Sequence, residues 1–140
     1  MKETKRKNIL DLPYSLHDAH VNRIDIVPEQ VTLWFDAGFY KPMNGDGLPV
    51  KGYVTFEDVD FDFCYAYLMD STIDCGQFTG KKFVLTQFAK CFPNIDFEII
   101  DETYGYNQSK FSGFFYEGEK VKECIIEIYH FGAMTYLTEE

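Results

Sequence analysis

The stretch YVTFEDVDFDFCYAYLM, from Tyr53 to Met69, carries the clearest folding signal in the chain. Apolar and aromatic side chains recur at every second position, which is the period of a β-strand and not of a helix. The opposite side of this strand begins with acids and ends with small or apolar residues, so we expect it to pass from solvent into the core. A bulge near Glu57-Asp58 would divide the strand. The face predicted to be buried consists of Val59, Phe61, Phe63, Tyr65 and Tyr67.

Segments on both sides of this stretch repeat the two-residue period. Val31, Leu33 and Phe35 share one face of a run that follows the turn at Pro28-Glu29, and the residues before this turn alternate as well. Two such runs around a short turn predict a hairpin. Short connections between successive strands imply antiparallel neighbours. Further strands are predicted over 95–104, 110–118, 120–132 and 133–138.

One segment has the period of a helix. In KFVLTQFAKCFPN the residues Phe83, Val84, Gln87, Phe88 and Cys91 follow three-and-four spacing, and Pro93 marks the end. The spacing predicts a helix from Lys82 to Cys91 that covers one face of the sheet. The piece KFVLT alone is also compatible with a strand.

These elements predict one β-rich domain over residues 1–140. Its fold class is α+β, a predominantly antiparallel sheet of about six to eight strands with one main helix packed on it. Residues 1–8 are predicted to be a frayed leader. Residues 38–52 predict a long connection, a candidate lid or binding loop, because prolines flank the turn dipeptides Asn44-Gly45 and Asp46-Gly47.

The charge balance narrows the classes of partner. The net charge is −10, which disfavours nucleic acid and anionic membranes, because binding to phosphate depends on Lys and Arg. A basic protein remains a suitable partner, although an acidic surface also simply keeps proteins soluble.

Cysteine spacing and hydropathy indicate in which cellular compartment the protein works. Cys64, Cys75, Cys91 and Cys124 form no Cys-x-x-Cys pair, so the sequence gives no zinc-ribbon or thioredoxin-like signal. No apolar run has the length of a signal peptide core or a membrane span. We therefore expect a cytoplasmic protein with free thiols.

His17, Asp18 and His20 form a candidate metal site. Imidazole nitrogen is a preferred zinc ligand, and His130 or an acid could complete the set. The alternative, which we favour, is that Ser15-x-x-Asp18 is a capping box at one helical turn.

Asp58-x-Asp60-x-Asp62 resembles the start of a calcium-binding loop, but the required Gly is Phe63 and the required Glu is Met69. We interpret these acids as the solvated face of a strand. They belong to a longer interval, Gly52 to Gly80, that contains no Lys or Arg. A surface patch that carries only negative charges would attract a cationic partner. The candidate partner-binding residues are Glu57, Asp58, Asp60, Asp62, Asp70 and Asp74.

Polar and aromatic residues around YGYNQSK suggest a small-ligand pocket, since such pockets place a few polar groups among aromatic rings. Turn chemistry at Gly105 and Asn107, and a core role for His130, are the alternatives. The candidate ligand-binding residues are Tyr104, Tyr106, Asn107, Gln108, Lys110 and His130.

No nucleophile elbow, phosphate-binding loop or dinucleotide fingerprint is present in the sequence, so nothing supports catalysis or a cofactor. Three segments together resemble small bacterial proteins, some of which are grouped with the immunity proteins of contact-dependent and polymorphic toxin systems. The resemblance covers about half of the chain and implies a cytoplasmic, non-catalytic protein that binds a partner. The segments are LPYSLHDAHV, FEIIDETYGYNQSKFSGFFY and ECIIEIYHFGAMTYL.

Three hypotheses follow. The first is an interaction protein, immunity-like, that presents an acidic and aromatic surface to a basic protein. The second is a ligand- or metal-binding domain that uses His17, His20 and the segment 104–110. The third is that no site exists beyond a self-pairing sheet edge that gives a homodimer.

Overall fold

The computed structural model describes residues 1–42, 47–70 and 79–140. In these residues the chain forms eleven strands, a short helix α1 (Leu85–Cys91) and a 3-10 helix η1 (Phe61–Phe63). All the strand pairs are antiparallel and they build two sheets. The predicted α+β class with a mostly antiparallel β-structure is confirmed, but the described strands outnumber the predicted ones.

Each sheet mixes strands from both ends of the chain. The first sheet has the order β1 (Lys2–Lys5), β11 (Met134–Thr138), β5 (Leu48–Glu57), β4 (Gln30–Lys41) and β3 (Arg23–Val27). The second has the order β2 (His20–Val21), β8 (Phe97–Gly105), β9 (Gln108–Glu117), β10 (Lys120–Tyr129), β6 (Tyr65–Met69) and β7 (Gly80–Val84).

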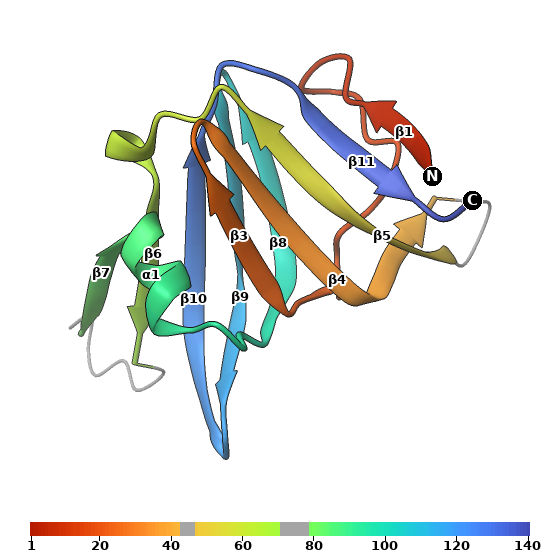
Figure 1. Ribbon diagram of the computed structural model, residues 1–140. Coiled ribbons are helices and arrows are strands. Elements are labelled where there is room, and N and C mark those ends of the chain that lie inside the picture. Colours follow the sequence, from red (N-terminus) through yellow and green to blue (C-terminus); the bar gives the residue numbers. More distant parts are fainter. Residues whose placement is uncertain (43–46, 71–78) are drawn as a thin grey trace.

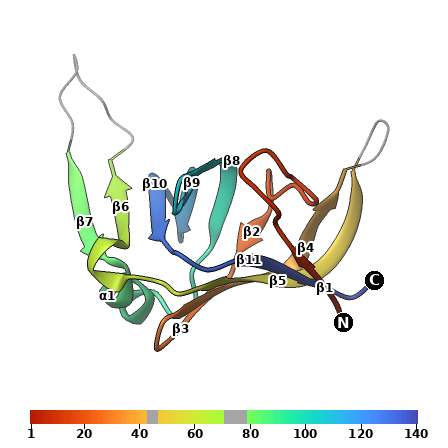
Figure 2. The same cartoon turned by 90° about the horizontal axis from the view of Figure 1, so that it is seen from above.

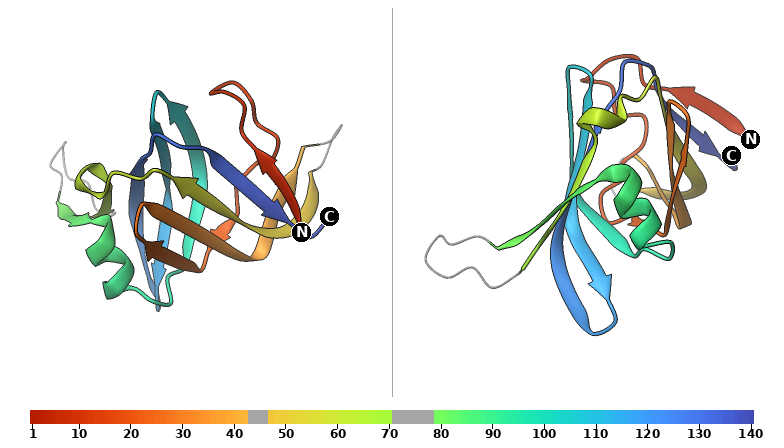
Figure 3. Two further views of the ribbon diagram at one scale, coloured as in Figure 1. Left: turned by 45° about the horizontal axis from the view of Figure 1, so that its top comes forward. Right: turned by 60° about the vertical axis from the view of Figure 1, so that its left-hand side comes forward.

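The two sheets face each other and enclose the core (Figures 1 and 2). Helix α1 lies at one end, beside β3 of the first sheet and β6 and β7 of the second. The hairpin of β6 and β7 extends away from the rest of the molecule (Figure 3, right). The predicted face of the β4 segment is confirmed, because Val31, Leu33 and Phe35 are buried. Phe97 and Ile99 on β8, and Cys124, Ile126 and Ile128 on β10, are buried as well.

The chain passes between the sheets at sharp corners. Only Asn22 separates β2, in the second sheet, from β3, in the first. Its backbone N–H donates to the Trp34 carbonyl at 2.9 Å, and its side-chain oxygen accepts a hydrogen bond from the Asp36 N–H at 2.9 Å. The amide side chain of Asn22 thus accepts the hydrogen bond of a backbone N–H group that has no partner strand at the corner.

The structure corrects the prediction for Tyr53–Met69. The first strand ends at Glu57, where Asp58 has a φ of +50°, and η1 then interrupts the chain before β6. The break near Glu57-Asp58 is confirmed, but the predicted buried face is wrong. Of the five residues predicted to share a buried face, only Val59 is fully buried, and Phe63 is 57% exposed.

Beyond the break the buried side of β6 is the opposite one, formed by Cys64, Ala66 and Leu68. Ala66 pairs with Ile126 and Leu68 with Cys124, so the register on β10 fixes which side faces inward. Tyr65 and Tyr67 lie half-buried on the outer side, a position that tyrosine tolerates because its ring carries a polar hydroxyl.

Two further boundaries differ from the prediction. Lys82, Phe83 and Val84 belong to β7 and pair with β6, so the helix begins only at Leu85. The backbone of β6 offers a free edge, and pairing with it satisfies these residues' polar groups in place of a first helical turn. Residues 2–5 are not a frayed leader, because they pair with β11 as an edge strand.

The predicted connection over 38–52 is mostly strand. β4 continues to Lys41 and β5 begins at Leu48, whereas Asn44, Gly45 and Asp46 lie outside the described residues. Gly38 makes this continuation feasible, since its φ is +82° and a Cβ atom there would lie 2.1 Å from the Val50 carbonyl oxygen. The register shifts at this point, between Phe35 and Phe39, as in a β-bulge.

In the described part of the chain, the helices are too short and polar to include a candidate membrane span.

Candidate functional site: an acidic hollow with an aromatic ridge

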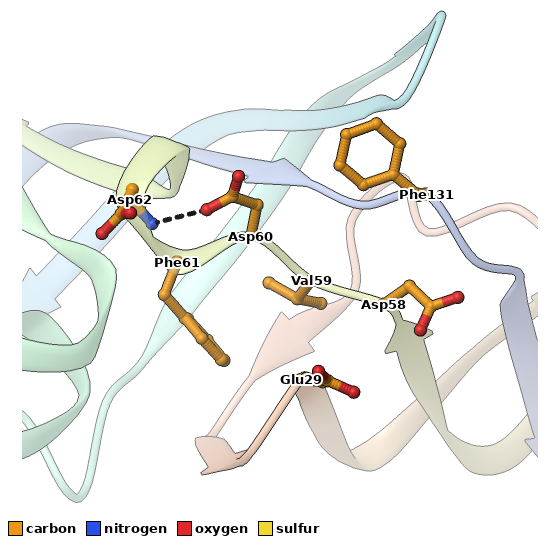
Figure 4. Close-up of a pocket in the computed structure, with 7 residues that line it drawn as sticks. All are labelled: Glu29, Asp58, Val59, Asp60, Phe61, Asp62 and Phe131. Carbon is orange, nitrogen blue, oxygen red and sulfur yellow. Dashed lines mark hydrogen bonds between the residues drawn. The ribbon is translucent and has the colours of Figure 1, made fainter.

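A hollow of about 370 Å³ opens beside η1 at the end of the β3–β4 hairpin. It brings together three of the predicted acids, Asp58, Asp60 and Asp62, with a fourth carboxylate from Glu29 (Figure 4). We call this site the acidic hollow. It is lined by Glu29, Asp58, Val59, Asp60, Phe61, Asp62 and Phe131.

Backbone hydrogen bonds tie three distant segments together around the acidic hollow. The Val59 N–H donates to the Glu29 carbonyl at 2.9 Å, and the Phe131 N–H donates to the Asp58 carbonyl at 3.0 Å. Glu29 and Asp58 both have positive φ values, +63° and +50°. Their carboxylates are therefore presented by tight turns that the backbone pairing fixes.

The four carboxylates have different roles. Asp60 is half-buried and caps η1, because its Oδ1 accepts a hydrogen bond from the Asp62 N–H at 3.1 Å. Glu29, Asp58 and Asp62 are exposed. None of the four takes part in a salt bridge with another described residue. Their negative charge is thus not compensated locally.

Phe131 lines the acidic hollow and is the first of a row of aromatic rings. We call this row the aromatic ridge: Phe131, Tyr129 and Phe63. Ring centroids are 5.1 Å apart between Tyr129 and Phe131 and 5.7 Å apart between Phe63 and Tyr129. Phe131 is 59% exposed. Exposed rings beside uncompensated carboxylates can contact a cation through their faces.

Not all predicted partner-binding residues belong to this site. Glu57 is exposed at the end of β5 and lines a separate groove. Asp70 lies beyond the far end of β6, where it accepts a hydrogen bond from the Thr79 hydroxyl at 3.0 Å. Asp74 lies outside the described residues. The interpretation of Asp58, Asp60 and Asp62 as one strand face is wrong, because a turn and η1 carry them.

The candidate metal residues are split between different partners. His17 Nδ1 lies 3.1 Å from Asp18 Oδ2, whereas His20 Nδ1 lies 2.7 Å from Asp96 Oδ1. His130 directly follows β10, roughly 24 Å along the strand from the level of His20. Among the described residues, no group of three or more His, Cys, Asp or Glu side chains is placed to hold a metal ion.

The predicted capping box does not form, because Asp18 has a φ of +66° and no helix follows it. Ser15 still acts locally: its Oγ accepts a hydrogen bond from the His17 N–H at 3.3 Å. This is the turn chemistry of serine without the helical turn.

The candidate ligand residues point to different sides of the second sheet. Tyr106 and Asn107 form the two-residue turn between β8 and β9, with Tyr106 90% exposed and Asn107 at a φ of +57°. Tyr104 points toward the core side and donates to Glu102 Oε1 at 2.6 Å. Gln108 and Lys110 pair with Tyr129 and Glu127, so they lie on the outer side of the sheet.

His130 is held between the sheets by two hydrogen bonds. Its Nδ1–H donates to the Gly132 carbonyl at 2.9 Å, so the neutral ring accepts through Nε2 from the Ser109 hydroxyl at 2.8 Å. The ring also packs edge-on against Phe56. The core alternative in the sequence prediction agrees with this geometry.

We expect His130 to make the protein less stable in mild acid. Burial lowers the pKa of His130, with a smaller lowering effect from Arg6, while the hydrogen bond to Gly132 raises it. The unfolded chain therefore takes up a proton at a pH where the folded chain resists it, and stability falls below the ordinary histidine pKa of about 6.5. Urea unfolding at about pH 7.5 and about pH 5 should show a smaller loss for His130→Gln than for the wild type. An equal loss in both proteins would assign the pH dependence to other groups.

Sequence reasoning missed two members of the site, Glu29 and Phe131. Each is far along the chain from Asp58–Asp62 and reaches the hollow only through the pairing of η1 and its flanks with other segments. The turn dipeptide Pro28-Glu29 was the one local signal that could have indicated an exposed carboxylate.

Four strands, β1, β3, β2 and β7, lie at the edges of the two sheets. Self-pairing of such an edge in a homodimer stays a prediction.

Comparison with family models, with curated proteins and with solved structures found no significant match for this chain.

Proposed function

We propose that the chain is a non-catalytic interaction protein whose acidic hollow and aromatic ridge receive a basic segment of a protein partner. The observation that carries this proposal is the juxtaposition of uncompensated carboxylates with exposed rings. Glu29, Asp58 and Asp62 are exposed, and Phe131 lines the hollow beside them.

The chemistry of this surface fits arginine best. A guanidinium group forms paired hydrogen bonds with a carboxylate and stacks on aromatic rings, and lysine does both less well. The net charge of −10 adds a long-range attraction that would speed the encounter with a cationic protein.

An immunity protein of a bacterial toxin system is the version of this function that the sequence resemblance supports. Such a protein would work in the cytoplasm and would inhibit a basic toxin by covering a cationic region of it. Three features favour this version: the acidic surface, the aromatic ridge and the resemblance in the three sequence segments quoted above.

The experiment is capture of partners from a lysate of the source cell, with the double variant Asp58→Asn/Asp62→Asn beside the wild type. We expect the variant to retain its stoichiometric partner about tenfold less well. Raising the salt to about 0.5 M should likewise reduce the retention of the partner by the wild type. Asparagine keeps the size of each side chain and removes only its charge.

The matched control is Asp101→Asn/Glu119→Gln, which removes the same charge from exposed positions outside the acidic hollow. Equal weakening by both double variants would mean that only net charge matters and would contradict a defined site. Partners that bind regardless of salt would contradict the ionic basis of the proposal.

A further inference from the structure

A second surface lies on the outer side of the first sheet, away from the core. There a groove of about 270 Å³ crosses the strands. Its floor is a row of threonines in direct register, Thr32 on β4, Thr55 on β5 and Thr135 on β11. Residues directly opposite one another in antiparallel strands share a face, so the three hydroxyl-bearing side chains form one line. We call this surface the Thr groove.

One wall of the Thr groove is aromatic and held rigidly. Trp34 and Tyr53 are cross-strand neighbours whose ring centroids are 4.4 Å apart. Trp34 Nε1–H donates to Asp25 Oδ2 at 2.7 Å, and the Arg23 guanidinium lies 4.3 Å from the indole centroid on the ring's face. Leu137 continues the wall on β11 beside Tyr53.

The opposite wall is polar. Gln30 on β4 and Glu57 on β5 are directly paired, and both line the groove. The groove therefore offers an amide and a carboxylate on one side, apolar ring edges on the other, and hydroxyl groups between them.

The floor contains a polar atom that lacks a partner. Thr135 is only 3% exposed, and its Oγ1 has no hydrogen-bond partner among the described residues. A buried hydroxyl without a partner destabilises the folded state, and valine would fill the same space on a strand without that cost. The Oγ1 atom is itself covered in this conformation, so a ligand in the groove would supply the missing hydrogen bond after the side chain rotates.

We propose that the Thr groove binds an extended β-linked oligosaccharide that runs across the strands. Sugar rings combine apolar C–H groups with hydroxyl groups that both donate and accept, which matches a groove with one apolar wall, one polar wall and a hydroxyl floor. The threonines repeat at the strand spacing of about 4.8 Å, and the rings of an extended β-linked chain repeat at nearly the same interval.

Charge supports a neutral ligand. The charged residues lining the Thr groove, Glu3 and Glu57, are both acidic. An anionic ligand would be repelled there, whereas the hydroxyl groups of the floor can pair with an uncharged polar ligand. After a rotation of the Thr135 side chain, a sugar hydroxyl pressed onto the floor would pair with its oxygen.

Trp34 provides a direct readout because it is the single tryptophan in the chain. We would titrate the full chain with cellohexaose and with chitohexaose, and with maltohexaose as the α-linked comparison, while recording tryptophan emission. The expected result is a saturable change with at least one β-linked hexaose at millimolar concentration or below and none with maltohexaose. Failure of both β-linked probes, or an equal response to maltohexaose, would overturn the proposal.

Variants locate the binding. Thr55→Val/Thr135→Val should weaken the emission response about tenfold while the protein stays folded, since valine suits a strand and Thr135 loses no hydrogen bond. Thr103→Val, the same change at an exposed strand position on the second sheet, should bind as the wild type does. Gln30→Ala, on the polar wall, tests the same groove without altering its floor. Wild-type affinity in both groove variants would overturn the assignment.

This site is separate from the acidic hollow, and the two proposals can fail independently. Asp58→Asn/Asp62→Asn should bind the oligosaccharide as the wild type does, because neither residue lines the Thr groove. Loss of sugar binding in that variant would place the sugar at the acidic hollow and would overturn the inference.

Discussion

The substitution Phe88→Pro is expected to abolish folding. Phe88 is the fourth residue of α1 and is fully buried. Proline removes its N–H and places a ring against the carbonyl of the preceding turn, which costs about 3 kcal/mol or more. The phenyl ring is lost as well, and burial of a Phe is worth about 3–5 kcal/mol against alanine. Together these losses approach the whole stability of an ordinary domain, about 5–15 kcal/mol.

The cost of the lost ring follows from its neighbours. Phe88 packs against Phe83 at 5.5 Å, Phe92 at 5.1 Å and Phe115 at 6.0 Å between ring centroids. Those three rings come from β7, from the residue after α1 and from β9. The helix therefore closes one end of the core by means of this side chain.

Two companion variants separate the contributions to this effect. Phe88→Ala removes the ring and keeps the helix, and it should lower the free energy of unfolding by about 3–5 kcal/mol. Gln87→Ala, at the exposed neighbouring position, should change it by less than about 0.5 kcal/mol. Circular dichroism shows whether each variant is folded, and urea unfolding measures its free energy of unfolding. A cooperative transition in Phe88→Pro with near wild-type midpoint would show that α1 is dispensable.

Hairpins were the part of the fold that the sequence predicted best. The β3–β4 pair, and the strands around the turn at Gly118-Glu119, combine a strict alternation with turn residues, and Gly118 has the positive φ that such a turn uses. Local chemistry fixes both register and direction in these cases. The existence and order of these strands were therefore predicted correctly.

The stretch Tyr53–Met69 shows why the same rhythm can mislead. Rings and aliphatic side chains occur on both of its sides, so the period predicts a strand without deciding which side is inward. The chain breaks at Asp58 and η1 interrupts it, yet the core-facing positions are even-numbered on both sides of the break: Val54 and Phe56 before it, and Cys64, Ala66 and Leu68 after it. Only the long-range register of β6 on β10 settles the matter, and no local signal contains it.

The two proposed sites differ in how far the sequence could reveal them. Asp58, Asp60 and Asp62 are close in sequence and were predicted to act together, and they do line one hollow. Thr32, Thr55 and Thr135 are far apart in sequence and meet only through the register of β4, β5 and β11. A threonine at an outward strand position is ordinary by itself, so the Thr groove leaves no signature in the sequence.

Glu102→Ala is expected to lower the free energy of unfolding by about 2–4 kcal/mol. This is a large effect for a polar residue on a strand that is only partly buried. Its Oε2 accepts a hydrogen bond from the Leu16 N–H at 2.7 Å, and its Oε1 accepts one from the Tyr104 hydroxyl at 2.6 Å. Burial raises the pKa of Tyr104, with further raising contributions from Tyr136 and Glu102, so this hydroxyl stays protonated and keeps donating. The carboxylate thus fastens the N-terminal segment, through the fully buried Leu16, to β8.

Removing the carboxylate leaves the Leu16 N–H without its acceptor, and that loss explains the size of the effect. Asp101→Ala is the matched control, because the neighbouring side chain is exposed and should cost less than about 0.5 kcal/mol. Urea unfolding gives the free energy of unfolding of each variant. Amide hydrogen exchange at Leu16 and Asp18 adds a local measurement. The Leu16 N–H depends on Glu102, whereas the Asp18 N–H donates to the Ile99 carbonyl at 2.7 Å. Faster exchange at Leu16 alone would mean a local release, and faster exchange at both would mean that the whole segment depends on Glu102. Equal stability of the two variants, with exchange unchanged, would contradict the role assigned to this carboxylate.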